Sequence, residues 1–458
     1  MKRALALASC WAALVGAPAL AAEITRTLEA FVPGNPWDAQ IEVNYSRSLR
    51  RALISREKAE GSERPSTRYF DDKELRYSRI DHNMDFKLRF ALYRDLEVFV
   101  NFPIVLSRSQ FAGLAQNGGD PGLSRTGGCD GAGRPTGDST IVRDGLFRGG
   151  GIPSLPDKNL THLEAGTRTP NRGRSILGQA GVTQSAGCYL GESGVPTSES
   201  VRSGFGDMTI GMAWAPLNNR RDDTDPTWLL RLEYQLPTGT TMDPSPKDPV
   251  GGSFRPRNDT AGYGQHALNF ATYFSKKVHN AVEPYVGLEY SAFFPSTSNV
   301  FQRISPNQEH VGPGQKAGVV AGVELIPYEN RKHQIKFAID LRLRARATFE
   351  GRDYSEVADF LGRVTDIETY ATFDASLHFY LQISKWFMAR FHVGLAHDTK
   401  HFITFANIGE DRNGNGFVEN TVTEQNPTYD PMTDQVGRRL SVAETTVFTW
   451  GFSLIAMF

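Results

Sequence analysis

The sequence has no long apolar run beyond its N-terminus, few cysteines and almost no net charge. Outside residues 4–15, no stretch approaches the roughly 18 consecutive apolar residues that a membrane-spanning helix needs. A net charge of −1 gives no reason to expect a nucleic acid as partner. A mean hydropathy of −0.38 fits a soluble protein, but it also fits a β-barrel, whose strands need apolar residues on only one face.

The N-terminus has the parts of a secretory signal peptide. Lys2 and Arg3 precede the apolar residues 4–15, and Ala19-Leu20-Ala21 forms a small-residue cleavage site. We therefore expect residues 1–21 to be removed on export. The alternatives are an uncleaved anchor and a lipoprotein signal with Cys10 as the lipidated residue. The apolar run continues past Cys10, which argues against the lipoprotein signal.

Cleavage leaves two cysteines in the mature chain, Cys129 and Cys188. Two thiols in an exported protein predict one disulfide bond, with two free cysteines as the alternative.

Alternation of apolar and polar residues with a period of two dominates the rest of the chain. In 335–343, for example, Ile, Phe, Ile, Leu and Leu alternate with Lys, Ala, Asp and Arg. Such alternation is typical of strands with one apolar face. It predicts twelve strands, an even number as in bacterial outer-membrane barrels: 39–53, 76–92, 96–107, 206–215, 228–237, 265–275, 282–294, 315–326, 334–349, 368–382, 386–397 and 444–458.

The connections between these strands fall into two length classes. Those after even-numbered strands are short: 93–95, 216–227, 276–281, 327–333 and 383–385. Those after odd-numbered strands are long: 54–75, 108–205, 238–264, 295–314, 350–367 and 398–443. Outer-membrane barrels have short periplasmic turns and long extracellular loops, so this sorting favours a barrel over a soluble β-sandwich.

We therefore predict an all-β fold, a transmembrane antiparallel β-barrel of about 12 strands spanning 38–458. Residues 108–205 are expected to form a long extracellular insertion, and they hold 21 of the 44 glycines. Residues 22–37 are then either a periplasmic N-terminal segment or a plug. The expected location is the outer membrane of a Gram-negative bacterium, with its lipid and lipopolysaccharide as surroundings.

The last strand has the form of an assembly signal. Trp450, Phe452, Leu454 and Ala456 alternate up to the terminal Phe458. Outer-membrane barrels commonly end in an aromatic residue preceded by apolar residues at every second position. We expect this strand to be recognised by the barrel assembly machinery.

Two short stretches resemble a known family. Ser203-Gly204-Phe205-Gly206-Asp207 precedes the fourth strand, and Leu236-Pro237-Thr238-Gly239 closes the fifth. They are similar to motifs of the meta-pathway of phenol degradation family of outer-membrane proteins. The resemblance implies a barrel that serves as a channel for aromatic or other hydrophobic compounds. It covers 203–239 closely and the rest of the chain to the C-terminus loosely.

Charged residues in the strands occupy the face opposite the apolar one, because each would cost about 2–4 kcal/mol against lipid at the membrane midplane. The predicted pore-lining residues are Arg79, Asp85, Lys87, Arg89, Lys336, Asp340, Arg342, Arg344, Arg346, Asp374, Arg390 and His392. Two interpretations of Arg342, Arg344 and Arg346 stay open. They form either an anion-selective wall or a salt-bridge network with Glu368 and Asp374.

An enzyme is disfavoured. Outer-membrane phospholipase A is also a twelve-stranded barrel and uses a His and a Ser two residues apart on one strand. Here Ser376 precedes His378 by two, but in the reverse order and on the inner face. We therefore predict no catalytic residues.

One loop has calcium-ligand spacing. Asp411, Asn413, Asn415, the Phe417 carbonyl and Glu419 follow the start of an EF-hand-like loop, with Gly416 at the bend. Position twelve is Val422, so the bidentate carboxylate is missing. Ca²⁺ within 405–425 is therefore one interpretation, and a plain Asn-Gly turn is the other.

These observations predict an outer-membrane channel or transporter for small molecules, either hydrophobic or aromatic ones. The alternative is a structural or surface-binding barrel with a plugged lumen.

Overall fold

The computed structural model describes residues 22–31, 37–60, 68–114, 197–219, 225–242, 248–250, 253–255, 261–278, 281–297, 310–330, 333–358, 364–418, 423–429, 433–437 and 439–458. Cys129 and Cys188 lie outside these residues, so the disulfide stays a prediction. Among the described residues, no helix is long and apolar enough to span a membrane.

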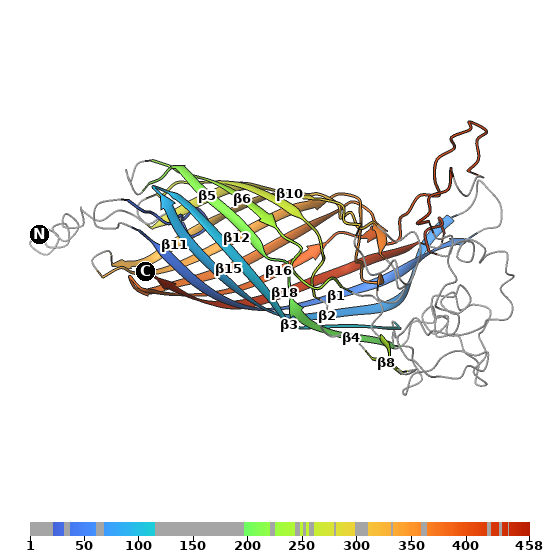
Figure 1. Cartoon of the computed structure of the whole chain (residues 1–458), viewed down its shortest axis with the longest axis horizontal. Helices are drawn as coiled ribbons and strands as arrows, with labels where there is room; N and C mark the ends of the chain where they lie inside the picture. The colour runs from blue at the N-terminus through green and yellow to red at the C-terminus, as the bar shows by residue number, and fades with distance from the viewer. Residues whose placement is uncertain are drawn as a thin grey trace, which may run out of the picture.

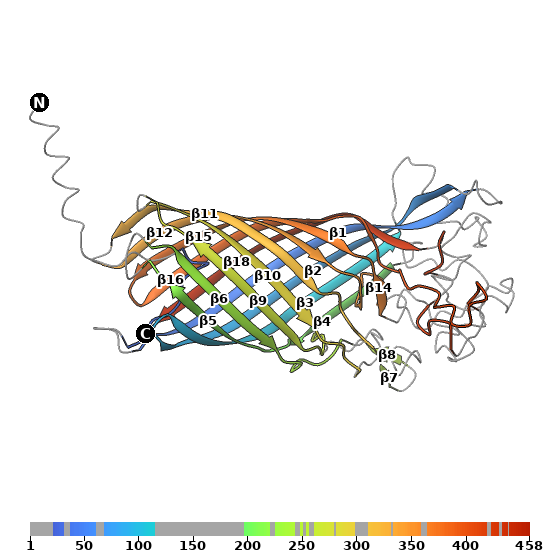
Figure 2. The same ribbon diagram turned by 90° about the horizontal axis from the view of Figure 1, so that it is seen from above.

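Twelve antiparallel strands form a closed barrel, as the period-two pattern predicts (Figures 1 and 2). They are β1 (Ala39–Glu60), β2 (Arg68–Tyr93), β3 (Leu96–Leu114), β5 (Thr209–Leu217), β6 (Thr227–Gln235), β9 (Ala267–Ser275), β10 (Val282–Phe293), β11 (Lys316–Asn330), β12 (Ile335–Thr348), β15 (Tyr370–Ser384), β16 (Phe387–Asp398) and β18 (Leu440–Met457). Six shorter strands are β4 (Thr197–Phe205), β7 (Asp248–Val250), β8 (Ser253–Arg255), β13 (Gly351–Asp353), β14 (Thr365–Ile367) and β17 (His401–Phe402).

The first and last barrel strands close the sheet. β1 pairs with β18 from Gln40 opposite Met457 to Arg56 opposite Leu440. The terminal residue completes the seam, because the Phe458 N–H donates to the Ala39 carbonyl at 2.9 Å. Closure leaves no strand edge with unpaired backbone groups, which is what a sheet surrounded by lipid requires.

Two outer connections differ from the prediction. β3 runs on to Leu114 and pairs there with β4 (Thr197–Phe205), so strand residues occupy both ends of the predicted insertion 108–205. β1 and β2 continue as a hairpin past the other strands (Figure 2), which shortens the predicted connection 54–75 to 61–67. The alternation marks only the part of a strand that faces lipid. Beyond the membrane, backbone hydrogen bonds between two strands can continue a hairpin even where apolar and polar residues do not alternate. The sequence pattern therefore missed these extensions.

Four aromatic rings lie across glycines of the neighbouring strand. Phe99 faces Gly211, Tyr273 faces Gly287, Tyr285 faces Gly322 and His392 faces Gly451. A Cβ on any of these glycines would lie 2.3 Å from the aromatic side chain opposite. The rings therefore lie flat against the wall instead of pointing into the lumen. This arrangement leaves space inside a barrel that is only intermediate in size.

We expect Gly211→Ala to lower the stability of the barrel, because the added methyl group overlaps the Phe99 ring. Overpacking of this kind costs about 1–3 kcal/mol. Thermal unfolding followed by circular dichroism measures the loss, and Phe99→Leu in the same chain should recover part of it. Gly394→Ala is the control, since its Cβ would lie 3.2 Å from the nearest atom. Equal melting temperatures for Gly211→Ala and Gly394→Ala would contradict the packing argument.

Candidate functional site

The strand parity places the charged residues inside the barrel. In β12, Lys336 is 2% exposed and Asp340 is 1% exposed, whereas Leu341 and Leu343 on the other face are about half exposed. The apolar face is continuous around the barrel and has exposed side chains such as Phe274, Val286 and Leu325. The wall is therefore apolar outside and strongly polar inside.

The predicted pore-lining residues fall at different levels of the lumen. Arg89 and Lys336 lie at the periplasmic end, where the short turns and the C-terminus are (Figure 1). Arg79 lies toward the outer end and pairs with Asp81, which also binds Arg108. The remaining nine are at middle levels: Asp85, Lys87, Asp340, Arg342, Arg344, Arg346, Asp374, Arg390 and His392.

The three arginines of β12 have different environments. Arg342 binds Asp340 at 2.7 Å and the Tyr285 hydroxyl at 3.2 Å. Arg344 binds Glu289 on β10 at 3.1 Å, although Asp374 is its direct neighbour on β15. Within the described residues, Arg346 makes no ion pair.

Neither of the two partners named from the sequence pairs with this wall. Within the described residues Asp374 makes no ion pair, and Glu368 accepts a hydrogen bond from the Phe402 N–H at 2.9 Å instead. Arg342 and Arg344 therefore do form salt bridges, as in the network interpretation, but with Asp340 and Glu289 as partners. The anion-attracting interpretation is left to Arg346.

Two adjoining cavities occupy the middle of the lumen. One has a volume of about 340 Å³, and its charged lining consists of Arg231, Glu233, Glu289, Lys316, Arg344 and Arg346. The other has a volume of about 290 Å³ and is lined by Glu42, Asp85, Lys87, Arg231, Glu233 and Arg390 among others. Because Arg231 and Glu233 line both, the cavities form one polar chamber with this pair between them.

The first cavity carries an excess of positive charge. Arg231 pairs with Glu233 at 2.5 Å, and Arg344 pairs with Glu289. Lys316 and Arg346 are the two remaining cations, and neither has a carboxylate partner within the described residues. The second cavity has three carboxylates and three cations, so its charges balance.

An aromatic ring forms part of the chamber wall. Phe99 is 1% exposed, and two cations lie over its ring: Lys87 Nζ at 4.2 Å from the centroid and the Arg231 guanidinium at 4.8 Å. Cations in this position are attracted to the face of an aromatic ring. The chamber therefore combines positive charge with aromatic surface.

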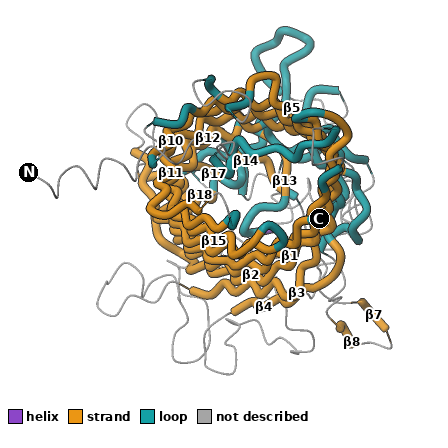
Figure 3. The backbone as a smooth tube through the Cα atoms, turned by 90° about the vertical axis from the view of Figure 1, so that its left-hand side faces the viewer, coloured by secondary structure: helices purple, strands orange, loops and turns teal. Residues whose placement is uncertain are grey.

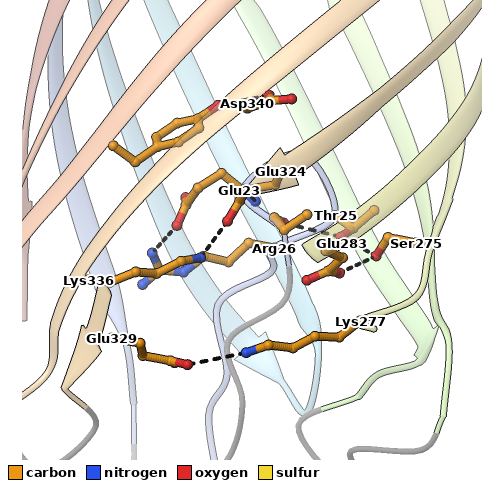
Figure 4. A network of polar contacts seen from close by, with 12 residues as sticks. Glu23, Thr25, Arg26, Ser275, Lys277, Glu283, Glu324, Glu329, Lys336 and Asp340 are labelled. Atoms are coloured by element: carbon orange, nitrogen blue, oxygen red, sulfur yellow. Dashed lines mark hydrogen bonds and ion pairs between the residues drawn. The ribbon is translucent and has the colours of Figure 1, made fainter. Parts of the chain in front are cut away.

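The N-terminal segment (22–31) lies inside the barrel, near the end where the short turns are. Its Ala22, Thr25, Leu28 and Ala30 are fully buried. Figure 4 shows Glu23, Thr25 and Arg26 of this segment beside side chains of the barrel strands. The Leu28 N–H donates to Glu97 on β3, and the Arg26 carbonyl accepts from Arg89 on β2. Ala22 packs below the chamber against a cluster that includes Phe99 and Tyr285.

Two inward-folded stretches narrow the outer end. We call them the lid, comprising 351–358 and 401–406. Val357 and Ile403 of the lid pack against lumen-facing apolar residues of the barrel strands: Ala52, Ile54, Leu75, Tyr77, Ala112, Leu440 and Val442. Looking along the barrel axis, Figure 3 shows β13, β14 and β17 within the outline of the barrel.

An ion pair fastens the lid to the wall. Glu356 binds Arg50 of β1 at 2.6 Å, and Arg50 also binds Asp398 at 3.0 Å. Burial raises the pKa of Glu356, but the charges of Arg50 and His401, with smaller contributions from a backbone hydrogen bond and Arg79, together outweigh burial and hold the pKa below its ordinary value. The lid is therefore fastened by a carboxylate that stays charged at neutral pH.

Ser376 and His378 do contact each other, at 3.1 Å between Oγ and Nε2. Within the described residues, His378 has no further hydrogen bond that would orient its ring. Nucleophilic catalysis needs an activating base that a third group holds in place. The pair also faces the lumen rather than lipid, as the sequence parity predicts.

The calcium-like loop satisfies its oxygens locally. The Asp411 carboxylate accepts hydrogen bonds from the N–H groups of Gly414, Asn415 and Gly416 at 2.6–3.2 Å. The hydrogen bond from Gly416 and its neighbours lower the pKa of Asp411. The Asn413 side chain also accepts from the Asn415 N–H at 2.9 Å, and the Asn415 side chain accepts from the Phe417 N–H at 2.8 Å. Glu419 lies outside the described residues, so calcium binding stays a prediction.

No other metal centre is indicated. In the described ranges, no three His, Cys, Asp or Glu side chains lie close enough together to hold a metal ion.

Sequence reasoning missed several residues of the chamber. Glu42, Phe99, Arg231 and Glu289 lie on lumen-facing positions of their strands and could have been found by parity. The role of the N-terminal segment had no such signal, because ten residues outside the period-two pattern give no indication of where they lie.

Comparisons with known proteins add little beyond the architecture. No protein-family model matches the chain, and no curated protein matches its sequence. An outer-membrane channel from Pseudomonas putida F1 is similar, with 9% identity over 93% of this chain and 100% of that one and a TM-score of 0.41. A FadL homologue from Pseudomonas aeruginosa shows 9% identity over 92% and 90%, with a TM-score of 0.33. The resemblance of 203–239 to the phenol-degradation family therefore stays a prediction.

We expect Glu356→Gln to loosen the lid at neutral pH. A carboxyl group whose pKa is lowered by folding stabilises the fold above its unfolded pKa of about 4.3. That contribution is lost as the pH falls through the lower, folded-state pKa. Hydrogen exchange of 351–358 should therefore be faster in Glu356→Gln than in the unaltered protein at pH 7, and the difference should vanish once the pH has fallen through the lowered, folded-state pKa of Glu356.

Glu350→Gln is the matched control, because the exposed Glu350 makes no ion pair among the described residues. Identical exchange of 351–358 in all three proteins at pH 7 would show that Arg50 does not fasten the lid.

Proposed function

We propose that this chain is an outer-membrane channel for small organic anions, including aromatic carboxylates, and that it is closed at rest. The observation that carries the proposal is the chamber in the lumen, with its two unpaired cations and its aromatic wall. Lys316 and Arg346 would attract a carboxylate, and the Tyr273 ring, which lines the same cavity, would contact an aromatic ring. A neutral hydrocarbon would have to displace water from this charged lining without replacing its hydrogen bonds.

We infer a closed resting state from the segments that lie in the lumen at the two ends of the barrel. The N-terminal segment occupies the periplasmic end, and the lid occupies the outer one. The N-terminal segment makes no strand ladder with the wall, and the lid joins it only through β17 at the outer end of β18. Both can therefore move without separating two strands of the barrel. Passage of a solute then requires displacement of these segments.

A structural barrel with a permanently plugged lumen is the second candidate, and the burial of the N-terminal segment favours it. A lipid hydrolase is not proposed, because Ser376 and His378 lack a third group and an opening to lipid.

Removal of the N-terminal segment should open the channel. We expect a variant in which residue 32 directly follows the signal sequence to conduct in planar bilayers at least several-fold more than the intact chain. Conductance steps of purified protein give the measurement, and circular dichroism confirms that the barrel has formed. A folded variant without any conductance would favour the structural barrel.

Substitution of the unpaired cations should change ion selectivity, whereas substitution of the paired Arg342 should change stability. Arg346→Gln together with Lys316→Gln should reduce the anion-to-cation permeability ratio of the opened variant, more at low salt than at high, with little change in melting temperature. Arg342→Gln should instead cost about 3 kcal/mol of stability, because it leaves the buried Asp340 without its cation. Reversal potentials and melting curves test both. An unchanged reversal potential in the double variant would contradict the proposed anion preference.

A further inference from the structure

Buried ionic contacts gather at the end of the barrel where the short turns lie. We call this group of residues the floor: Glu23, Arg26, Lys277, Glu283, Glu324, Glu329 and Lys336. Figure 4 shows Glu324 of β11 between two donors: Lys336 Nζ at 2.6 Å from one oxygen and the Glu23 N–H at 2.8 Å from the other. The Glu23 side chain pairs in turn with Arg26 at 2.9 Å. Glu324 and Lys336 are almost completely buried, so these charges are matched within the protein.

One carboxylate of the floor lacks a cation. Glu283 of β10 is 0% exposed, and its Oε1 accepts a hydrogen bond from Ser275 at 2.6 Å. Its Oε2 is buried and has no hydrogen-bond partner in the part of the chain that the structure describes. A buried carboxylate without a counter-charge is costly, so this oxygen indicates a missing cationic donor.

The other carboxylates of the floor are already paired. Glu324 binds Lys336, Glu23 binds Arg26, and Glu329 binds Lys277 at 3.3 Å. Of the four floor carboxylates labelled in Figure 4, Glu283 is therefore the one without a cationic partner among the described residues.

Ala22, the first residue of the expected mature chain, lies close to Ser275, which binds the Glu283 carboxylate. Ala22 is fully buried, and its carbonyl accepts hydrogen bonds from the Thr25 N–H and hydroxyl. The Thr25 hydroxyl lies 2.9 Å from the hydroxyl of Ser275, the residue that binds Glu283. The hydroxyl groups of Thr25 and Ser275 thus lie between Ala22 and Glu283.

Cleavage after Ala21 would create a cation at this point. Hydrolysis adds one water to the peptide bond, leaves a carboxylate on Ala21 and frees the α-amino group of Ala22. An α-amino group has a pKa of about 7.7–8.0 and is largely protonated at neutral pH. Before cleavage, the same nitrogen is a neutral amide with a single N–H.

We propose that the α-ammonium group of the mature N-terminus at Ala22 binds the Glu283 carboxylate, and that export processing thereby fastens the N-terminal segment inside the barrel. The ion pair supplies the missing counter-charge of the floor. The uncleaved chain cannot form this pair, so the segment is held more weakly before processing than after it. This inference does not depend on whether the lumen conducts.

Amine labelling of the mature, folded protein tests the pairing. Intact mass should place the first residue at Ala22. Acetic anhydride at pH 8 should acetylate the Ala22 amine at least ten-fold more slowly in the folded protein than in denaturant, as measured by peptide mass spectrometry. Glu283→Gln should restore a large part of the lost reactivity. Glu329→Gln is the matched control from the same floor and should leave Ala22 protected.

Three results would overturn the proposal: a mature chain that begins elsewhere, an amine that reacts equally fast in folded and denatured protein, or protection that Glu283→Gln leaves unchanged. The last would mean that burial alone shields the amine. If Glu283→Gln fails to fold, a variant with one glycine inserted between Ala21 and Ala22 provides a second test. Its displaced amine should react faster than that of the unaltered protein, and equal protection would count against the pair.

Discussion

The pairing of β1 with β18 is the interaction on which the rest of the structure depends. Lipid offers no hydrogen-bond partner to a peptide group, so a sheet in a membrane has to close on itself. Closure fixes the two faces of every strand for the whole length of the membrane. Each charged residue of a strand must then face inward, because the outer face is in contact with lipid. The polar chamber is thus a consequence of closing a sheet whose sequence alternates between apolar and charged residues.

Charged side chains in a narrow lumen are stabilised by pairing with opposite charges. Glycines in the strand between two such side chains leave the space that lets them reach each other. Gly322 of β11 lies between Tyr285 of β10 and Arg342 of β12, and the tyrosine ring crosses it to reach Asp340. Gly318, opposite Glu289, leaves a similar gap that the Arg344–Glu289 pair spans. Side chains therefore interact across two strands instead of only with adjacent ones. The same glycines let rings lie flat, so the pairing does not fill the chamber.

These long-range pairs explain how far the sequence could predict the site. Parity gave the strands and the inward direction of the charges, because both follow from a period of two along one chain. It could not give partners, which depend on register and on which neighbouring position is a glycine. Asp374 was the natural candidate for Arg344 as its direct neighbour, yet Glu289 is the group that binds. The N-terminal segment was beyond prediction for a different reason, since its position depends on contacts with five barrel strands rather than on a local pattern.

The structure separates a wall that cannot change from segments that can. Every strand of the wall is held by ladders of hydrogen bonds on both sides, and opening any ladder would expose backbone groups to lipid. The N-terminal segment and the lid are held by side chains and a few backbone hydrogen bonds, all inside the lumen, where water can replace them. Elements that move are drawn from the least stable parts of a fold. In this barrel those parts lie at the two ends of the chamber, so the same constraint that makes the wall rigid confines motion to the two ends.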